Sequence, residues 1–485
     1  MTRLSAAMLA GLPVTIERPA YDRSAIRTGV VHLGIGAFHR AHQAAIFEAA
    51  LASGDLRWGI VGVSLRSAGV RDQLVPQDGL YSLVVRQGAE QQVRIIGAVT
   101  DVLVAPEDPA RVVAALASAH VHIVTLTVTE KGYRLDPATG RLIENDPDVA
   151  ADLTDLSAPR TAPGFLVAGL KARRAAGLPP FTAISCDNLP HNGQRLRDAV
   201  LAMARAHDGA LADWIAAEGA FPQTMVDRIV PATTEADIAA LAKRIGVDDR
   251  AMVKTEPFLQ WVIEDRFCGP RPDFAALGVQ LTADVAPWEE AKLRLLNGAH
   301  SGIAYLGGLA EFDFVDQFVA DPRGRAFVDA LWDESAPTLS PPPGLDFAVY
   351  RNALMARFAN SALEHRTRQI AMDGSQKLPQ RLVAPLLQRR AAGQPVDRLT
   401  LAIAGWMRWQ SGIDDAGRPF VVDDPLAART EAALAGCTTT DERVRALLGI
   451  EAIFPPALAA DGVLVGMVGH HLDRLERDGA LATLG

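Results

Sequence analysis

The chain has 485 residues, of which 49% are apolar and 22% charged, as expected for a globular protein of two or three domains. A net charge of −9, a pI near 5.7 and the lack of a Lys/Arg run argue against a nucleic-acid surface. No apolar run is long enough to span a membrane, and Pro13 and Glu17 interrupt any N-terminal signal peptide. Because the three cysteines are far apart and suit a reducing compartment, we expect a cytoplasmic protein.

The N-terminal residues predict a βαβ unit. Val30–Leu33 is a short apolar run that ends in Gly34-Ile35-Gly36, and a helical pattern follows to about Ala52. After a glycine break, Trp58–Ser64 forms a second buried run. Strand, glycine turn, helix and strand within this length are typical of a βαβ unit.

Further strands and helices alternate along the first 285 residues. This alternation predicts an α/β fold with a Rossmann-type, doubly wound and mostly parallel sheet. After about Pro287 the pattern is almost entirely helical, so we expect domains at 1–285 and 286–485. The sequence WVIEDRF (Trp261–Phe267) is interpreted as a solvated turn. The other expected strands are Val93–Ile96, His122–Val128, Phe181–Ser185, Thr224–Val230 and Met252–Lys254, and the expected helices include Pro109–Ala119, Pro163–Ala176 and Arg195–Glu218.

The glycine turn matches the dinucleotide fingerprint only in part. Gly34 and Gly36 stand where the first two glycines allow a tight turn and close approach of a pyrophosphate. His39 occupies the position of the third glycine, so we expect looser helix–strand packing there. The second strand ends in Ser64 and Arg66 rather than in an acidic residue, which leaves NADP as an alternative to NAD.

Polar residues follow several buried runs. Thr129 and Glu130 come after His122–Val128, and Asn188 comes after Phe181–Ser185. In an open α/β sheet the carboxyl ends of the strands line the ligand crevice, so these residues are candidates for a site. A turn or a structural ion pair is the competing interpretation for each.

The segment Glu289–His300, EEAKLRLLNGAH, is the strongest chemical signal. In an α-helix Lys292, Asn297, His300 and Glu289 fall within an arc of about 140° among leucines. A lysine buried there loses its proton more easily, as proton transfer near neutral pH requires. The alternative is a snorkelling lysine beside a structural histidine, with Asn297-Gly298 interrupting the helix.

Other catalytic classes have little support. The histidines and cysteines show no HExxH or CxxC spacing, so we expect no metal site. Neither a GxSxG elbow nor a Walker loop is present, which argues against esterases and phosphotransferases.

Six motifs occur in the order typical of one family. They are GxGAFHRAHQ, TVTEKGY, SCDNLPxNG, MVDRIVPAT, EPFxQWVIEDxF and KLRLLNGxH. With these motifs the chain resembles the mannitol dehydrogenase family, the polyol-specific long-chain dehydrogenases, over nearly its whole length. The resemblance implies a zinc-independent, NAD(P)-dependent oxidoreductase with a Rossmann-type domain and a mostly helical C-terminal domain.

The same resemblance implies roles for individual residues. Lys292 would be the general acid/base, and Glu289 would relay protons between it and solvent. Asn188 and Asn297 would hold the developing oxyanion, His300 would orient the substrate, and Asp227 would support the site. The cofactor-binding residues implied or expected are Gly34, Ile35, Gly36, Ala37, Phe38, Arg40, Arg66, Thr129 and Glu130.

Within the family, the C-terminal segments most resemble fructuronate reductases, also called D-mannonate oxidoreductases. They are His365–Arg381, Ala404–Gly417 and Glu442–Phe454. The substrate would then be a small sugar acid, and Arg366, Arg368, Lys377 and Arg381 could bind its carboxylate. These cations could instead only decorate a helix.

Two alternative functions stay open. The enzyme could act on a neutral polyol, as a mannitol 2-dehydrogenase does, or the chain could be a cofactor-binding sensor without activity. It could be a monomer or a small homo-oligomer.

Overall fold

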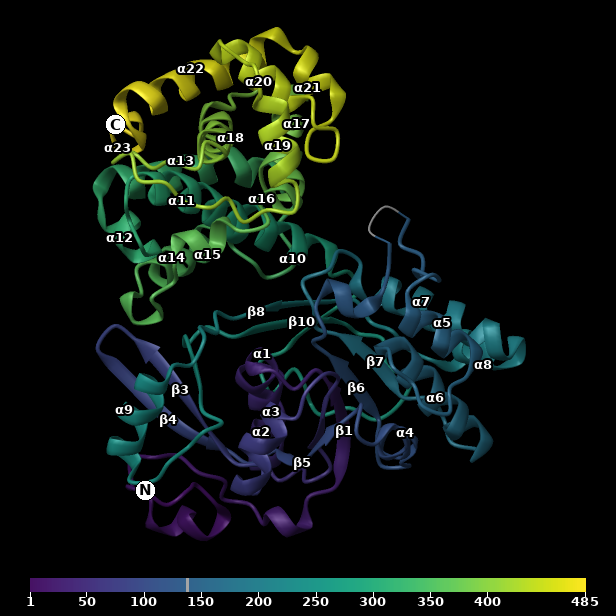
Figure 1. Cartoon of the computed structure of the whole chain (residues 1–485). Coiled ribbons are helices and arrows are strands. Elements are labelled where there is room, and N and C mark those ends of the chain that lie inside the picture. Colours follow the sequence, from purple (N-terminus) through teal and green to yellow (C-terminus); the bar gives the residue numbers. More distant parts are fainter. Residues whose placement is uncertain (137–138) are drawn as a thin grey trace. The chain divides into compact units, whose positions relative to one another are not determined.

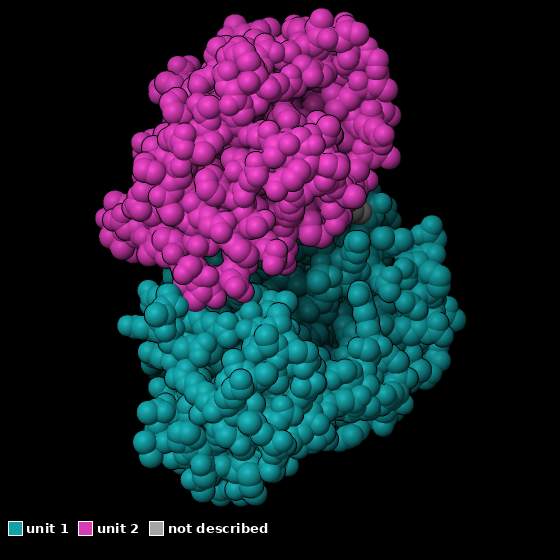
Figure 2. Space-filling model, turned by 60° about the vertical axis from the view of Figure 1, so that its left-hand side comes forward, with its two compact units in different colours: residues 1–285 teal, residues 286–485 magenta. Residues whose placement is uncertain are grey.

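The computed structural model describes residues 1–136 and 139–485 (Figure 1). The chain forms two compact units, Met1–Val285 and Ala286–Gly485, which are coloured separately in Figure 2. Each unit has its own hydrophobic core: one large cluster spans Leu295–Leu484, and three clusters lie within the first unit. No described helix is long and apolar enough to cross a membrane.

A five-stranded parallel sheet forms the centre of the first unit. Its strand order is β5-β2-β1-β6-β7, and every neighbouring pair is parallel. Since β2 and β6 flank β1, the strand order reverses there, and ligands bind at such switch points in doubly wound sheets. This confirms the predicted fold class. The strands are β1 Thr28–Leu33, β2 Gly59–Ser64, β5 Val99–Val104, β6 Ile123–Leu126 and β7 Thr182–Ser185.

Both faces of this sheet are buried, which explains why its strands are apolar without a break. In β1, Val31 and Leu33 face the core formed with α4, α6 and α7, whereas Val30 faces the core formed with α2. Helices α4, α6 and α7 therefore cover one side of β1 and β6 (Figure 1). They span Pro109–Ala117, Ala162–Ala175 and Asn192–His207, and α2 spans Gln43–Ala52.

Two small sheets complete the strands of the first unit. One has the order β4-β3-β9 and the other β11-β10-β8. The turn expected at WVIEDRF is wrong, because Trp261–Ile263 are fully buried in β10, which pairs antiparallel with β8. The charged residues at the end of the motif suggested a turn, although its first residues form a short buried strand. The strands are β3 Tyr81–Gln87, β4 Glu90–Ile96, β8 Thr224–Asp227, β9 Val253–Thr255, β10 Gln260–Glu264 and β11 Gln280–Thr282.

Two expected helices are broken in the first unit. The helix after the glycine turn stops at Ala41 and restarts at Gln43, because His42 has a non-helical backbone. The helix expected at Arg195–Glu218 is also two helices, since Asp208 is extended and its side chain caps the second one. The remaining helices here are α1 Ala37–Ala41, α3 Gly69–Leu74, α5 Pro147–Thr154, α8 Gly209–Glu218 and α9 Glu235–Ile245.

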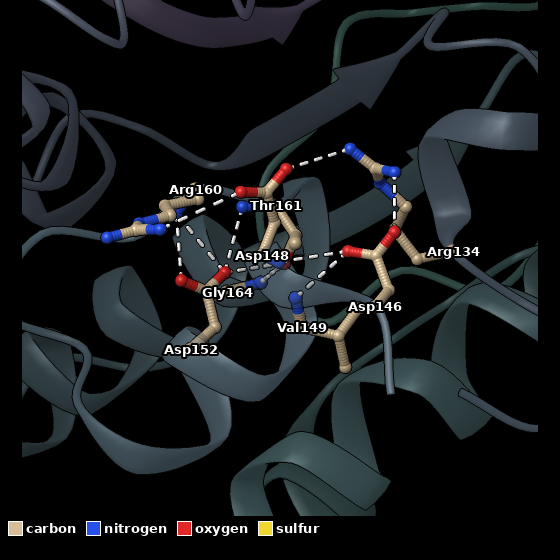
Figure 3. Close-up of polar contacts among 8 residues, drawn as sticks. All are labelled: Arg134, Asp146, Asp148, Val149, Asp152, Arg160, Thr161 and Gly164. Atoms are coloured by element: carbon tan, nitrogen blue, oxygen red, sulfur yellow. Dashed lines mark hydrogen bonds and ion pairs between the residues drawn. The ribbon is translucent and has the colours of Figure 1, made fainter. Parts of the chain in front are cut away.

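A polar network fixes the chain after β6 (Figure 3). Arg134 pairs with Asp146 and Asp148 at the start of α5. The fully buried Asp152 accepts hydrogen bonds from the backbone and hydroxyl of Thr161 at the start of α6. The network thereby ties the segment that follows the polar tip of β6 to two covering helices.

The second unit consists of helices packed around one core. Helix α11 is its most buried element, and it contacts α13, α15 and α18. The helices are α10 Ala286–Ala291, α11 Gly298–Leu309, α12 Val315–Ala320, α13 Pro322–Ser335, α14 Phe347–Phe358, α15 Thr367–Ala371, α16 Gly374–Leu378, α17 Ala384–Ala391, α18 Asp397–Trp409, α19 Ala427–Leu434, α20 Thr440–Leu448, α21 Pro456–Ala460, α22 Gly462–Asp478 and α23 Ala480–Thr483.

The segment between α10 and α11 is not an α-helix. Lys292–Asn297 is π-helical (η5), and the N–H of Gly298 donates to the carbonyl of Leu293, five residues back. The expected regular helix is therefore wrong over six residues, and the wider turn changes the angle between Lys292 and His300. The helix nevertheless continues through Asn297-Gly298 into α11.

Candidate functional site

The glycine turn follows β1 at the switch point of the sheet. Gly34 has a φ of 96°, and a Cβ there would lie 2.2 Å from the carbonyl oxygen of Thr127, so packing against β6 requires glycine. Gly36 is exposed, and a Cβ added to it would meet only the Gly34 oxygen, at 3.8 Å. The described atoms around Gly36 leave room for a side chain, so they do not require glycine at this position. Close approach of a pyrophosphate would require it.

Two stacked histidines, one of which contacts the Gly34 oxygen, lie beside this turn. The rings of His32 in β1 and His39 in α1 are 3.4 Å apart and nearly parallel. His32 Nε2 lies 3.1 Å from the Gly34 oxygen, and its Nδ1 lies 2.7 Å from the Thr125 hydroxyl. Burial lowers the pKa of His32 to about 3, so the ring is neutral. His39, at the position of the third glycine, thus stacks on a ring of β1.

Residues expected to bind the cofactor differ in where their side chains point. Arg40 is buried, and its guanidinium donates to the backbone oxygens of Gly36 and Ala251, so it supports the turn. Phe38 is half-buried and stacks on His42 at 5.1 Å. Arg66 is exposed two residues beyond β2, where a ribose or its phosphate would lie in a Rossmann domain.

Asp187 organises the polar tip of β6. Its carboxylate accepts hydrogen bonds from the N–H groups of Val128 and Thr129 and from the hydroxyl of Tyr133. Thr129 has a φ of 65°, an uncommon backbone for a residue with a side chain, and Asp187 holds it there. Burial raises the pKa of Asp187. Both Thr129 and Glu130 are exposed.

The other two site residues of the first unit follow or end strands. Asn188 is exposed next to Asp187, three residues after β7. Asp227 is buried at the end of β8, opposite Gln260 of β10. Asn188 thus lies beyond the carboxyl end of the parallel sheet, whereas Asp227 belongs to a smaller one.

In the second unit, η5 and the flanking turns hold four candidate side chains. Lys292 is 6% exposed, and Asn297 is half-buried. Glu289, one turn before Lys292, has a pKa raised to about 7 by burial, an effect that Lys292 partly opposes. A carboxyl group with this pKa can gain or lose a proton near neutrality.

The π-helical turn is held open by two side chains from other helices. The indole Nε1 of Trp332, in α13, donates to the Leu295 oxygen at 2.7 Å. Arg381 donates to the Asn297 oxygen and to the Ser301 hydroxyl, at 3.4 and 3.2 Å. These donors satisfy carbonyls in a segment where the regular hydrogen-bond ladder is interrupted. Arg381 belongs to a second π-helical segment, η8 (Pro379–Val383), which packs on η5.

His300 is buried on α11 within an aromatic and cationic environment. Its ring lies 4.8 Å from Phe358 and 4.9 Å from His365. Burial lowers the pKa of His300 well below its usual value, and His365, Arg357 and Arg381 lower it further. The imidazole is therefore neutral and can act as a hydrogen-bond donor or acceptor to a substrate.

Besides Arg381, three cations were expected to bind a carboxylate, and each of them has other contacts. Arg366 is exposed and lies over the Phe314 ring, while Arg368 stacks on Phe420 at 4.8 Å and faces Asp414. Lys377 donates to the oxygens of Ile370 and Met372. Each of these three side chains thus has a contact within the second unit.

Sequence reasoning missed four residues that these contacts single out. They are His32, Tyr133, Asp187 and His365. Asp187 stands next to Asn188 in a motif already noted, and its acidity at a strand end was the available signal. The others could not be found from spacing, because their partners lie far along the chain. Within residues 1–136 and 139–485, no group of three His, Cys, Asp or Glu side chains could hold a metal ion.

Comparison with known proteins identifies the family. Residues 28–276 match the model for the mannitol dehydrogenase Rossmann domain, and residues 284–476 match the mannitol dehydrogenase C-terminal domain. The chain belongs to the mannitol dehydrogenase family. It is therefore a member of a family of oxidoreductases, as its motifs predicted.

Relatives in this family differ in their substrates. The chain is 43% identical to the D-mannonate oxidoreductase of Escherichia coli K12, over 96% of both chains. It is 42% identical to a mannitol 2-dehydrogenase of Pyrenophora tritici-repentis, over 97% of this chain and 83% of that one. Among solved structures, Pseudomonas fluorescens mannitol 2-dehydrogenase in a ternary complex with NAD and D-mannitol superimposes with a TM-score of 0.88. It is 38% identical, over 100% of this chain and 99% of that one.

Proposed function

We propose that this protein reduces a keto sugar acid with NADH. The reaction is D-fructuronate, NADH and a proton to D-mannonate and NAD⁺, and it is reversible. The buried Lys292 carries this proposal, because it lies on one short segment with Asn297, Glu289 and His300 in a chain that also has a dinucleotide-type turn.

In this proposal Lys292 is the general acid/base. During reduction it donates a proton to the oxygen of the keto group, and during oxidation it takes the hydroxyl proton back. Asn297 and Asn188 donate hydrogen bonds to that oxygen as negative charge develops on it. Glu289 passes protons between Lys292 and water. His300 orients the substrate, and Asp227 supports the site.

The first unit fits a dinucleotide cofactor, which would supply the hydride. Gly36 leaves room for a pyrophosphate beside the N–H groups of the first turn of α1. The NAD bound by the Pseudomonas fluorescens relative supports NAD as the cofactor. Arg66 beyond β2 keeps NADP as the alternative. The remaining contacts would come from Ile35, Ala37, Phe38, Thr129 and Glu130, with Arg40 supporting the turn.

A sugar acid is favoured over a neutral polyol by the charges around His300. Arg357 and Arg381 both act on this ring, and such a cationic environment suits a carboxylate. Arg366, Arg368 and Lys377 remain candidates for the same role. Since the relatives include both D-mannonate oxidoreductase and mannitol 2-dehydrogenases, a mannitol 2-dehydrogenase is the second candidate.

A substrate panel tests the proposal. NADH and NADPH oxidation are measured with D-fructuronate, D-tagaturonate, D-fructose and D-xylulose. We expect NADH with fructuronate to give the highest kcat/KM. Preference for fructose would make the chain a mannitol 2-dehydrogenase, and no oxidation with any of the four would favour a cofactor-binding sensor.

A further inference from the structure

His365 is a second histidine beside His300 for which the mechanism above has no role. It lies between η7 (Ser361–Leu363) and α15, where its backbone oxygen accepts from the N–H of Val315. Its ring meets that of His300 edge to face at 4.9 Å. The backbone contact would survive a change of side chain, so the imidazole itself needs another explanation.

Each of these two rings has one buried nitrogen without a partner. Neither His300 Nε2 nor His365 Nδ1 makes a hydrogen bond within residues 1–136 and 139–485. A buried polar atom left unpaired costs free energy, and native proteins usually satisfy such atoms with a ligand or an ordered water. Two such nitrogens on adjoining rings can bind one ligand at two points.

The charges nearby indicate which ligand these nitrogens suit. The groups that act most strongly on His300 include Arg357, Arg381 and Lys292, all of them cationic. Arg357 also acts on His365. Burial lowers the pKa of His365 to about 4, so both rings are neutral and can each donate one N–H. Neutral donors in a positive environment suit an anionic acceptor.

The flanking cations are engaged differently. Arg368 faces Asp414, Lys377 donates to two backbone oxygens, and Arg366 is exposed over Phe314. By contrast, His300 and His365 each keep a buried nitrogen available. The pair of histidines is therefore better placed to bind the carboxylate than these three cations are.

We propose that His365 and His300 together bind the carboxylate of the sugar-acid substrate, with Arg357 and Arg381 supplying the positive potential. This inference rests on the proposed function, since it names the group that recognises that substrate. His365 would then determine specificity between sugar acids and neutral polyols.

Calorimetric titration of the enzyme–NADH complex with D-mannonate and with D-mannitol tests this without turnover, because cofactor and ligand are both reduced. The variant His365→Phe keeps the ring and removes both nitrogens. We expect it to weaken mannonate binding about 10- to 100-fold and mannitol binding less than about threefold. His365→Asn, whose amide can take the place of Nδ1, should restore part of the loss. His470→Phe, on the exposed face of α22, is the matched control.

Three results would overturn the inference: equal weakening of both ligands, no weakening in His365→Phe, or a wild-type protein that binds mannonate no better than mannitol. The proposed function is judged separately, by NADH oxidation with fructuronate. If the wild-type enzyme reduces fructuronate and His365→Phe binds mannonate as tightly as the wild type does, only the role of His365 is refuted. An enzyme inactive on fructuronate refutes the proposed reaction whatever the titrations show.

Discussion

At the scale of residues, Lys292 is a buried side chain that has an ionisable amine. Burying a lysine until it is 6% exposed costs free energy unless its amine is paired or hydrogen-bonded. Its neighbours Glu289 and Asn297 have the proton-transfer and hydrogen-bonding groups that such chemistry needs. This combination makes Lys292 the most informative single residue to change.

We predict that Lys292→Ala lowers kcat for fructuronate reduction by about 10²- to 10⁴-fold, because the proposed general acid that protonates the forming alkoxide is lost. NADH affinity, measured by fluorescence titration, should change by no more than about twofold. Lys243→Ala, at an exposed position of α9, is the control. Parallel loss of turnover and NADH binding would instead make Lys292 a structural residue.

Glu289 makes a pH-dependent prediction possible. Its pKa is raised to about 7, so the carboxylate is present above that pH and is lost as pH falls through it. A relay that removes protons during mannonate oxidation needs the carboxylate. The oxidation rate should therefore rise with pH, with a midpoint near 7, and Glu289→Gln should lack this step.

The pH profile of kcat with mannonate and NAD⁺ is the measurement. Glu431→Gln, at an exposed position of α19, should keep the wild-type profile. If Glu289→Gln shows the same inflection as the wild type, another group titrates.

At the scale of elements, the π-helical segment η5 is the feature that most depends on its surroundings. Trp332 and Arg381 come from 35 or more residues further along the chain, and both donate to carbonyl oxygens of this segment. A π-helical turn has poorer local energetics than an α-helix, so outside donors are needed to hold it. The angle between Lys292 and His300 follows from this arrangement.

Replacing Trp332 tests that dependence. Trp332→Phe leaves the Leu295 oxygen without its donor, and Trp406→Phe is a matched control. Trp406 is equally buried, but its indole nitrogen has no hydrogen-bond partner in the described part of the chain. We expect Trp332→Phe to cost about 1–3 kcal/mol more than Trp406→Phe in denaturant unfolding, and to lower kcat more. Equal losses would mean that the hydrogen bond contributes nothing to the turn.

At the scale of the whole molecule, the two units have separate hydrophobic cores, and the glycine turn after β1 belongs to the first unit. Residues of the large helical core all lie after residue 286, and the other three clusters all lie before it. Chains with separate cores often unfold in more than one step. A ligand that binds one unit stabilises the folded form of that unit by mass action.

We predict that scanning calorimetry resolves more than one transition, and that NADH shifts one of them upward more than the other. At a hundredfold excess over its Kd, NADH should add roughly 2.7 kcal/mol to the unit it binds. The same scan with mannitol alone is the control. A single two-state transition that moves as a whole would show that the two cores unfold together.

Much of the parallel sheet was accessible from the sequence. Strands buried on both faces are continuous apolar runs, so β1, β2, β6 and β7 were predicted close to their observed positions. The family was accessible too, because its motifs are short, ordered and specific. The short strand β10 was missed because its charged end resembles a turn.

Sequence alone determined the fold class, the family and the residue types available for proton transfer, since periodicity and motifs are local properties of the chain. Tertiary structure decided the rest. A tryptophan of α13 donates to the π-helical segment that contains Lys292, and the carboxylate of Asp187 accepts from the N–H of Thr129. The ring of His365 contacts that of His300, 65 residues earlier in the chain. Contacts between residues so far apart along the chain leave no periodic trace in it, because packing rather than local propensity brings them together.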